Sequence, residues 1–243
     1  MSKGVIFYTD MRLGKPIFPV VQGHIKKSGL PIVSVSLKKP LDFGKNIVVQ
    51  GERSYPTYIK QIKTALENST ADYVFFCEHD CLYPESHFEF TPPEDNIFYY
   101  NSNVWRWYFG GDTAITHKRM LPLSCLSVNR EFALEHYKLR EEHIEKVGLN
   151  KFRSREPRWA RLWGYEPGTK KKRRGGFSDD NFGVWYSEYP VVDIRHDRTF
   201  SKPKITLDSF KHKPEYWREI PIENIPGWDL RGLFGLKVPE ENL

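Results

Sequence analysis

Cysteine is scarce in this sequence, and long apolar runs are absent. The three cysteines, Cys77, Cys81 and Cys125, are an odd number and include no Cys-x-x-Cys pair. This argues against a disulfide framework and a structural zinc knuckle, and the thiols are expected in or near the core. No stretch approaches the roughly 20 consecutive apolar residues that a membrane-spanning helix needs, so no transmembrane segment is expected.

The start of the chain also lacks the pattern of a secretory signal. Residues 1–4 lead directly into a short strand-like run. A signal peptide would instead have a longer apolar segment followed by small residues. We therefore expect a cytoplasmic location.

The composition is that of an ordinary folded protein with a basic balance. The 243 residues are 39% hydrophobic and 28% charged, a composition that excludes intrinsic disorder. A chain of this length can form a large core without disulfides. The net charge of +6 favours anionic partners, such as a phosphate, a nucleotide, nucleic acid or a membrane surface. The aromatic content of 15% can supply stacking surfaces for sugars or bases.

Strand and helix patterns alternate in the first part of the chain. Short apolar runs predict strands, and apolar residues at helical spacing predict helices. The expected strands are residues 5–8, 31–37, 46–49 and 72–77, and the expected helices are residues 17–28 and 58–66. Strands separated by helices indicate an α/β fold with a mostly parallel sheet covered by helices.

The second part of the chain has weaker patterns. A charged helix is expected over residues 129–147 and a strand over residues 191–197. After residue 202 the periodicity is lost between prolines and charges, so residues 203–243 are expected to form an extension packed on a main domain of residues 1–202.

Polar residues follow the predicted strands where ligands bind in parallel sheets, beyond the carboxyl ends. These residues are Thr9, Asp10, Arg12, Arg53 and the triplet Glu78-His79-Asp80. The two carboxylates of the triplet are separated by one residue in a turn, where they can hold a divalent cation through oxygen. The alternative is an ordinary polar strand end before the turn at Tyr83-Pro84.

The order of these elements, ending in an apolar strand and Glu78-His79-Asp80, resembles the nucleotide-sugar half of GT-A glycosyltransferases. The triplet stands in the place of the Asp-x-Asp motif, with Glu78 as the departure. The resemblance covers about residues 4–200. It implies a Rossmann-like GT-A fold with a nucleotide-sugar half at residues 1–90 and an acceptor half at residues 91–202.

The resemblance also implies a site and its substrates. Asp80 would be the principal ligand of Mn²⁺ or Mg²⁺, and Glu78 would bind the metal through water or support it. The donor would be a nucleotide-diphosphate sugar, with a UDP-sugar favoured, and the acceptor would carry a hydroxyl group. By analogy and position, Arg12 and Arg53 would contact the nucleotide, with Thr9 and Asp10 near its base or ribose.

Histidine enters the expected site at two positions. His196 follows the late strand, and GT-A enzymes often draw a third metal ligand from such a histidine. An imidazole beside two carboxylates suits Mn²⁺ better than Mg²⁺, because borderline metals accept nitrogen. The alternative is a structural histidine. His79 is expected to orient the turn or to contact the sugar.

An acidic pair follows a glycine-rich stretch at residues 175–183, which resembles the start of the acceptor-side helix in these enzymes. By this match Asp180 is the candidate catalytic base, and Asp179 binds a hydroxyl of the acceptor or sugar. Ser178 or Asp179 could instead cap a helix N-terminus, and both interpretations can hold together. Inverting and retaining chemistry both stay open, because retaining GT-A enzymes share the donor half.

Two further segments could contact substrates. Lys172 and Arg173 belong to a basic run that could close over the diphosphate. Residues 151–174 mix cations with tryptophans, as in surfaces that bind a phosphate backbone and stack bases, so an anionic acceptor such as modified DNA would lie there. The alternative is a solvated loop. Residues 105–108 could form a floor for a sugar, because aromatic faces stack on pyranose rings.

Two other functions compete with glycosyl transfer. A metal-dependent nuclease would use the acids and the basic surface, but no lysine follows Glu78-His79-Asp80 at the spacing such enzymes need. A non-enzymatic nucleic-acid-binding protein would use the net charge and residues 151–174. It leaves the acidic residues unexplained, because they repel phosphate unless a metal intervenes.

Overall fold

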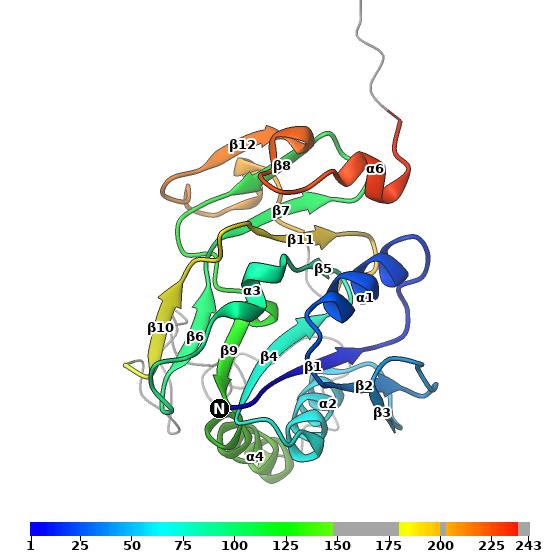
Figure 1. Ribbon diagram of the computed structural model, residues 1–243, viewed down its shortest axis with the longest axis vertical. Helices are drawn as coiled ribbons and strands as arrows, with labels where there is room; N and C mark the ends of the chain where they lie inside the picture. The colour runs from blue at the N-terminus through cyan, green and yellow to red at the C-terminus, as the bar shows by residue number, and fades with distance from the viewer. Residues whose placement is uncertain (148–179, 200–202, 238–243) are drawn as a thin grey trace, which may run out of the picture.

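A computed structural model describes residues 1–147, 180–199 and 203–237 of the chain. These residues form a mixed α/β fold with two sheets (Figure 1). The strands of the larger sheet are β1 (Lys3–Thr9), β2 (Ile32–Leu37), β3 (Lys45–Val49), β4 (Tyr73–Glu78), β6 (Phe98–Asn101), β9 (Leu126–Asn129) and β10 (Phe182–Trp185). The strands of the smaller sheet are β5 (Cys81–Leu82), β7 (Val104–Tyr108), β8 (Thr113–Thr116), β11 (Val191–Arg195) and β12 (Arg218–Pro221).

Helices lie on both faces of the larger sheet and beside the smaller sheet. They are α1 (Ile17–Lys27), α2 (Tyr55–Asn68), α3 (Glu85–Glu89), α4 (Arg130–Val147) and α6 (Leu230–Phe234), with short 3-10 turns at Leu123–Cys125, Leu207–Ser209 and Ile222–Asn224. In Figure 1, α2 and α4 lie together below the larger sheet, and α1 lies between it and the smaller sheet. None of the helices in the described ranges is long and apolar enough to cross a lipid bilayer.

The strand order of the larger sheet creates a switch point. The order is β10-β6-β9-β4-β1-β2-β3, and β9 alone runs against the other strands. The chain builds outward from β1 through β2 to β3 and then crosses by α2 to β4 on the other side of β1. Ligands of parallel α/β sheets bind where the strand order reverses in this way, so the carboxyl ends of β1 and β4 are the place to look for a site.

Alternate residues of the central strands serve two separate cores. Ile6 of β1 packs in the core that α2 closes with Ile62, whereas Phe7 packs in the core that α1 closes with Val21. Because both faces are buried, residues 5–8 of β1 and 73–77 of β4 are all apolar, without the alternation of a half-exposed strand. The three cysteines are buried and free, as the sequence predicts.

The predicted strands and helices of the first 90 residues all form, and the mostly parallel, helix-covered sheet is confirmed. Helix α2 begins three residues earlier than predicted. Ser54 caps it by accepting a hydrogen bond from the amide of Thr57 (3.3 Å), and Pro56 occupies its first turn. Both residues are suited to a helix start. The serine hydroxyl accepts a hydrogen bond from a backbone amide of the first turn, and proline has no amide hydrogen that needs an acceptor.

The smaller sheet has no counterpart in the sequence prediction. Strand β11, predicted as a late strand, pairs with β7 and β5 and not with the larger sheet. Residues after 203 contribute β12 at the edge next to β8, and Leu230 and Phe234 of α6 are buried in the core with Trp107. The sequence does not predict this packing, because the strands and helices of this segment are too short for their apolar residues to show a period.

A glycine before β3 offers a test of the packing. Gly44 has a φ of +64°, and a Cβ there would lie 2.3 Å from the carbonyl oxygen of Ile32. Gly44→Ala is therefore expected to lower the free energy of unfolding by about 2–4 kcal/mol, measured by urea denaturation. The control is Gly23→Ala inside α1, where no atom lies within 4 Å of the added methyl. That change should stabilise by roughly 0.5–1 kcal/mol, and equal effects of the two changes would contradict the packing.

Candidate functional site

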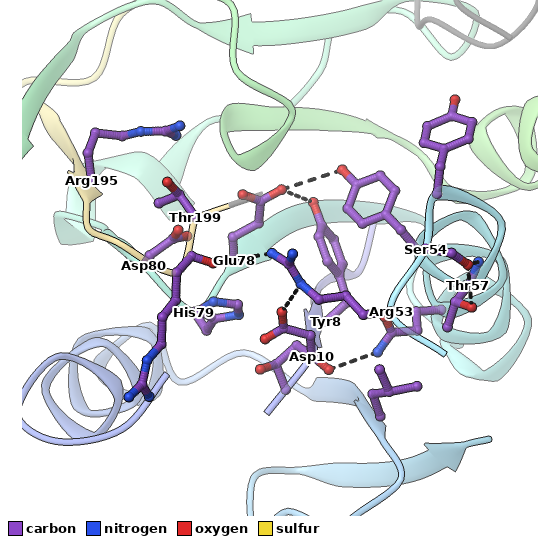
Figure 2. A pocket seen from close by; sticks show the side chains of 16 residues that line it. Tyr8, Asp10, Arg53, Ser54, Thr57, Glu78, His79, Asp80, Arg195 and Thr199 are labelled. Atoms are coloured by element: carbon purple, nitrogen blue, oxygen red, sulfur yellow. Dashed lines mark hydrogen bonds and ion pairs between the residues drawn. The ribbon is translucent and has the colours of Figure 1, made fainter. Parts of the chain in front are cut away.

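A cavity of about 370 Å³ opens at the switch point, between the carboxyl ends of β1 and β4 and the first turns of α2 (Figure 2). It is lined by three groups of side chains, which are acidic, basic and aromatic or neutral. The acids are Asp10, Glu78 and Asp80; the basic residues are Arg53, His79, Arg195 and Arg198; the others are Tyr8, Thr9, Leu37, Ser54, Tyr55, Thr57, Tyr58, Gln61 and Thr199.

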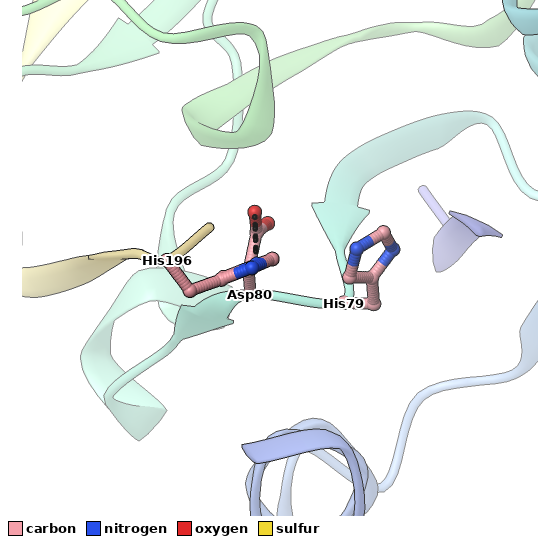
Figure 3. A group of neighbouring side chains, drawn as sticks. All are labelled: His79, Asp80 and His196. Carbon is pink, nitrogen blue, oxygen red and sulfur yellow. Dashed lines mark ion pairs between the residues drawn. The ribbon is translucent and has the colours of Figure 1, made fainter. Parts of the chain in front are cut away.

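Two distant parts of the chain bring His79, Asp80 and His196 together at one side of this cavity (Figure 3). The turn after β4 carries His79 and Asp80, and the end of β11 carries His196. The amide of Ile194 donates to the carbonyl oxygen of Asp80 (2.8 Å), which fixes the turn against β11. One ligand atom from each of the three side chains lies within 4.8 Å of the others, so the three can hold a metal ion.

Two ring nitrogens of the histidines lack good hydrogen bonds within the described part of the chain, which supports a metal site. Nε2 of His196 lies 3.5 Å from Oδ2 of Asp80, which is longer than a good hydrogen bond. Neither this nitrogen nor Nδ1 of His79 has a hydrogen-bond partner among the described residues, although both are buried. Unpartnered buried nitrogens are costly, and a cation between them and a carboxylate would satisfy both. The donor set therefore fits a divalent metal that accepts nitrogen.

The surroundings keep Asp80 ionised. Burial by itself would raise the pKa of this carboxyl, but the nearby His79, His196 and Arg195 together lower it below its ordinary value. An ionised carboxylate is the form that binds a cation, so the neighbours prepare this side chain for a metal.

The other nitrogen of His196 is engaged by the chain that follows it. Nδ1 accepts a hydrogen bond from the amide of Arg198 (3.1 Å), so in the neutral ring the proton lies on Nε2. A metal at Nε2 would take the place of this proton, and Nδ1 would then become a donor. The Arg198 amide would have to leave the ring, so a metal at this nitrogen is linked to the position of residues 197–199.

Glu78 lies apart from the three candidate ligands. Its Oε1 accepts hydrogen bonds from the hydroxyls of Tyr8 (2.9 Å) and Tyr58 (3.5 Å), as Figure 2 shows. Burial, followed by the neighbouring Asp80 carboxylate, raises the pKa of Glu78 to about 8. Residues 79 and 80 form a turn after β4, and Glu78 is not among the three side chains whose ligand atoms lie within 4.8 Å of one another.

Arginines line the cavity and are held in place by partners. Arg53 Nε lies 2.5 Å from Oδ2 of Asp10, and its Nη2 donates to the carbonyl oxygen of Arg198 (3.2 Å). Arg195 pairs with Asp193 (3.4 Å), which is itself buried. Guanidinium groups fixed in this way are suited to a phosphate or diphosphate, because they need little reorganisation to bind it.

Tyrosines form the wall of the cavity along α2. The Tyr8 and Tyr58 rings meet edge to face with centroids 5.4 Å apart, and Tyr55 stacks on Tyr58 at 6.4 Å. Gln61 donates to the carbonyl oxygens of Thr9 (2.9 Å) and residue 35 (3.2 Å), which ties α2 to the ends of β1 and β2. An aromatic wall beside a cluster of arginines has the chemistry that binds a base and its phosphates.

The remaining residues expected at the nucleotide are close to one another. Thr9, Asp10 and Arg53 line the cavity. Arg12 is exposed and does not line it, but its carbonyl oxygen accepts a hydrogen bond from Nη1 of Arg198 (2.5 Å). Arg12 thus holds the chain that crosses the mouth of the cavity.

Asp180 lies far from this group. It precedes β10, and the strand register places Gly183 level with Tyr99 of β6 and, through Ser127 of β9, with Phe75 of β4. Asp180 is therefore at the opposite edge of the sheet from the carboxyl end of β4, on the order of 25 Å from Asp80 at the ordinary rise and spacing of strands. The structure does not bring it to the site, so it is not placed to act there as a base.

Other expected contacts differ from the structure or lie beyond it. Trp105 and Trp107 of β7 are both buried in the core, so neither offers a face to a sugar. Asp179, Lys172, Arg173 and the basic residues 151–174 lie outside the described residues.

The sequence interpretation omitted ten of the sixteen residues that line the cavity, among them two tyrosines of α2 and two arginines. Tyr55 and Tyr58 are in the first turns of α2, where the capping pattern of Ser54 and Pro56 marks the helix start and could have shown them. Arg195 and Arg198 flank His196, so a search of the residues on both sides of that histidine would have found them.

Comparison with known proteins gives distant structural likenesses only. No family model and no curated protein matches the sequence. A crystal structure of the glycosyltransferase GlyE of Streptococcus pneumoniae TIGR4 is 11% identical, with a TM-score of 0.39, and the match covers 76% of this chain and 46% of that one. The chain thus spans less than half of GlyE.

Two further structures have similar scores. A glycosyltransferase involved in the glycosylation of the major capsid of PBCV-1 is 10% identical with a TM-score of 0.38, over 63% of this chain and 71% of that one. The inositol-1-phosphate CTP transferase of T. maritima is 12% identical with a TM-score of 0.36, over 58% and 74%. Likeness at this level assigns no family, so the function of the chain is inferred from the geometry of its site.

Proposed function

We propose that this protein is a metal-dependent glycosyltransferase that takes a sugar from a nucleotide-diphosphate donor, with a UDP-sugar favoured, and transfers it to a hydroxyl acceptor. One observation carries the proposal. His79, Asp80 and His196 meet at the switch point of an α/β sheet, on the rim of a cavity that also holds arginines and tyrosines. Metal ligands, cations and ring faces together suit a nucleoside diphosphate better than any of them alone.

Each group of residues has a role in this proposal. The tyrosine wall binds the base, and Arg195, Arg198 and Arg53 face the diphosphate. Asp80, His79 and His196 hold the metal, for which Mn²⁺ is favoured over Mg²⁺ because two of the ligands are imidazoles. A bound divalent ion neutralises the charge that develops on the diphosphate as it leaves. The arginines add fixed positive charge at the same oxygens, because Asp10 and Asp193 hold two of them in place.

A thermal-shift panel tests this function. Nucleoside diphosphates and nucleotide sugars are each added with Mn²⁺ and with a chelator. A ligand at 100 times its dissociation constant stabilises by about 2.7 kcal/mol. For a chain of this size that raises the melting temperature by about 5–10 °C. We expect such a shift with one class of nucleoside diphosphate, and only with Mn²⁺. No shift with any nucleotide would contradict the proposal.

Arg53 provides a prediction about binding. Arg53→Met is expected to weaken Mn²⁺-dependent UDP binding by at least about tenfold, because a charge-assisted contact is lost and Asp10 is left unpaired beside the phosphates. Isothermal titration calorimetry measures this. The control is Lys38→Met, which breaks an exposed ion pair with Glu52 and should change the affinity less than twofold. Similar losses in the two variants would argue against a phosphate contact at Arg53.

A further inference from the structure

A second hollow lies on the smaller sheet. It has a volume of about 480 Å³ and is formed by residues 117–119, which follow β8, and by residues 210 and 212–215, which precede β12. Figure 1 shows β8 and β12 at the top of the view, at the other end of the molecule from α2 and α4. None of the residues of the proposed donor site lines this hollow, so it is a separate feature of the surface.

Rings make up one part of the hollow and its surroundings. His117 lies parallel to Trp217 with ring centroids 6.4 Å apart, and Phe210 meets both rings edge to face, at 5.3 Å from His117 and 5.7 Å from Trp217. All three rings are half-buried, so each keeps an exposed part, and the nearby Tyr216 is 76% exposed. Half-buried rings of this kind are held rigidly and can stack with a planar group.

Cations surround these rings. Lys204 Nζ lies 5.1 Å from the Phe210 ring, and Lys118 Nζ lies 5.1 Å from the Tyr216 ring. Lys118 is partly neutralised by Glu215 at 2.8 Å. Arg119, Lys211 and Lys213 are exposed and have no ion pair among the described residues, so the surface keeps a positive charge.

We propose that this surface, formed by residues 117–119 and 204–218, binds single-stranded nucleic acid. Exposed cations would contact the phosphates, and the rings of Phe210, Tyr216 and Trp217 would stack with bases. Single strands are recognised by this combination of a positive groove and stacking rings. Of these rings, Phe210 lines the hollow, Trp217 packs against it and against His117, and Tyr216 is exposed nearby. Single rings of this kind can stack with unpaired bases, whereas the bases of a duplex are already stacked on one another.

The surface is connected to the proposed donor site through one face of the smaller sheet. Arg106 of β7 pairs with Asp193 (2.8 Å), the partner of Arg195, and its Nη1 donates to the carbonyl oxygen of Lys204 (3.3 Å). The strand register separates His117 from His196 by five residues along the strands and two strand spacings, about 20 Å. A strand of several nucleotides could therefore lie on the surface and extend towards the metal group.

Fluorescence anisotropy with a labelled 12-nucleotide oligothymidine tests the proposal, without metal or nucleotide sugar. Binding is therefore measured independently of glycosyl transfer. The charge variant is Lys211→Glu with Lys213→Glu, and its control is Lys39→Glu with Lys60→Glu, an equal charge change at two exposed lysines elsewhere. The ring variant is Tyr216→Ala, whose side chain is too exposed to matter for folding. Thermal melting verifies that each variant is folded.

The expected result is micromolar or tighter binding at low salt, weakened at least tenfold in the charge variant and at least fivefold in Tyr216→Ala. The salt dependence of the charge variant should also be less steep, by about 1.4 in the slope of log K against log salt. The control should change binding less than threefold.

Four results would overturn the proposal. The wild type could fail to bind the oligonucleotide, or bind a duplex or an anionic polysaccharide such as heparin more tightly. The charge variant and Tyr216→Ala could bind as well as the wild type, which would place nucleic-acid binding at another part of the chain. Equal losses in the charge variant and its control would show a general effect of net charge.

Discussion

Asp80→Asn is expected to abolish Mn²⁺-dependent binding of the nucleoside diphosphate and to lower transferase activity by about a hundredfold or more. The change removes the charged member of the His79, Asp80 and His196 group while keeping nearly the same shape. Substituting a residue that only hydrogen-bonds to a metal ligand already costs about 10–100-fold in metal affinity or activity. Loss of a ligand itself should exceed this. Titration calorimetry with Mn²⁺ and UDP measures the binding, and release of UDP from the donor measures the activity.

The matched control for this prediction is Asp42→Asn. It makes the same chemical change at an exposed carboxylate far along the chain from the site. Its binding and activity should equal those of the wild type. If Asp80→Asn kept more than a tenth of the activity and still responded to Mn²⁺, the metal would not be held at Asp80.

Arg195→Met should produce the second large effect, a loss of UDP affinity of at least about thirtyfold with little change in the affinity for UMP. Arg195 lines the cavity beside Asp80, and its charge can act on the terminal phosphate of the diphosphate. A charge-assisted hydrogen bond in a partly buried site is worth about 1.5–3 kcal/mol, which corresponds to this factor. Calorimetry with the two nucleotides, each with Mn²⁺, separates the contribution of the second phosphate.

Arg106→Met is the control, because both arginines pair with the buried Asp193 but only Arg195 lines the cavity. Removing Arg106 should lower the free energy of unfolding by about 1.5–3 kcal/mol and leave the ratio of UDP to UMP affinity unchanged. If the two variants lost stability alike and UDP affinity alike, Arg195 would act only through the fold.

The sequence predicts β1 to β4, four of the seven strands of the larger sheet, because their apolar runs alternate with helical patterns. Strands such as residues 72–77 read as continuous apolar runs, and α2 has a clear apolar face. The smaller sheet was missed for a physical reason. Strand β5 has two residues, β8 and β12 have four each, and such lengths show no period of their own. Strand β8 pairs locally with β7, but β5 with β11 and β8 with β12 join parts of the chain more than 80 residues apart.

The site was predicted in part. Asp80 and His196 follow strands of the two sheets, and the structure brings them together with His79. Glu78 was expected to bind the metal through water or to support it, and this role stays a prediction. The hydrogen bonds that its carboxylate accepts from Tyr8 and Tyr58 follow from no spacing rule. Asp180 follows a pattern of glycines and acids, yet its strand delivers it to the opposite edge of the sheet. The direction of a strand decides which end meets the ligand, and short motifs do not record it.

The metal and the chain that crosses the cavity are linked through His196. Its Nδ1 accepts the amide of Arg198, whose carbonyl oxygen and guanidinium are bound by Arg53 and by the backbone of Arg12. A metal held at Nε2 would leave the proton of the neutral ring on Nδ1, which could then no longer accept from this amide. Binding of the metal would therefore change the position of residues 197–199 at the mouth of the cavity.

The most direct test of the account is pulsed electron paramagnetic resonance of the protein with Mn²⁺ and UDP. Electron spin-echo modulation detects nitrogen nuclei bound to the metal and phosphorus nuclei close to it. We predict both signals together, the nitrogen from His79 and His196 and the phosphorus from the diphosphate. A Mn²⁺ spectrum with phosphorus but no nitrogen would contradict the assignment of the metal to these histidines, and one with nitrogen but no phosphorus would contradict its role in holding a nucleotide donor.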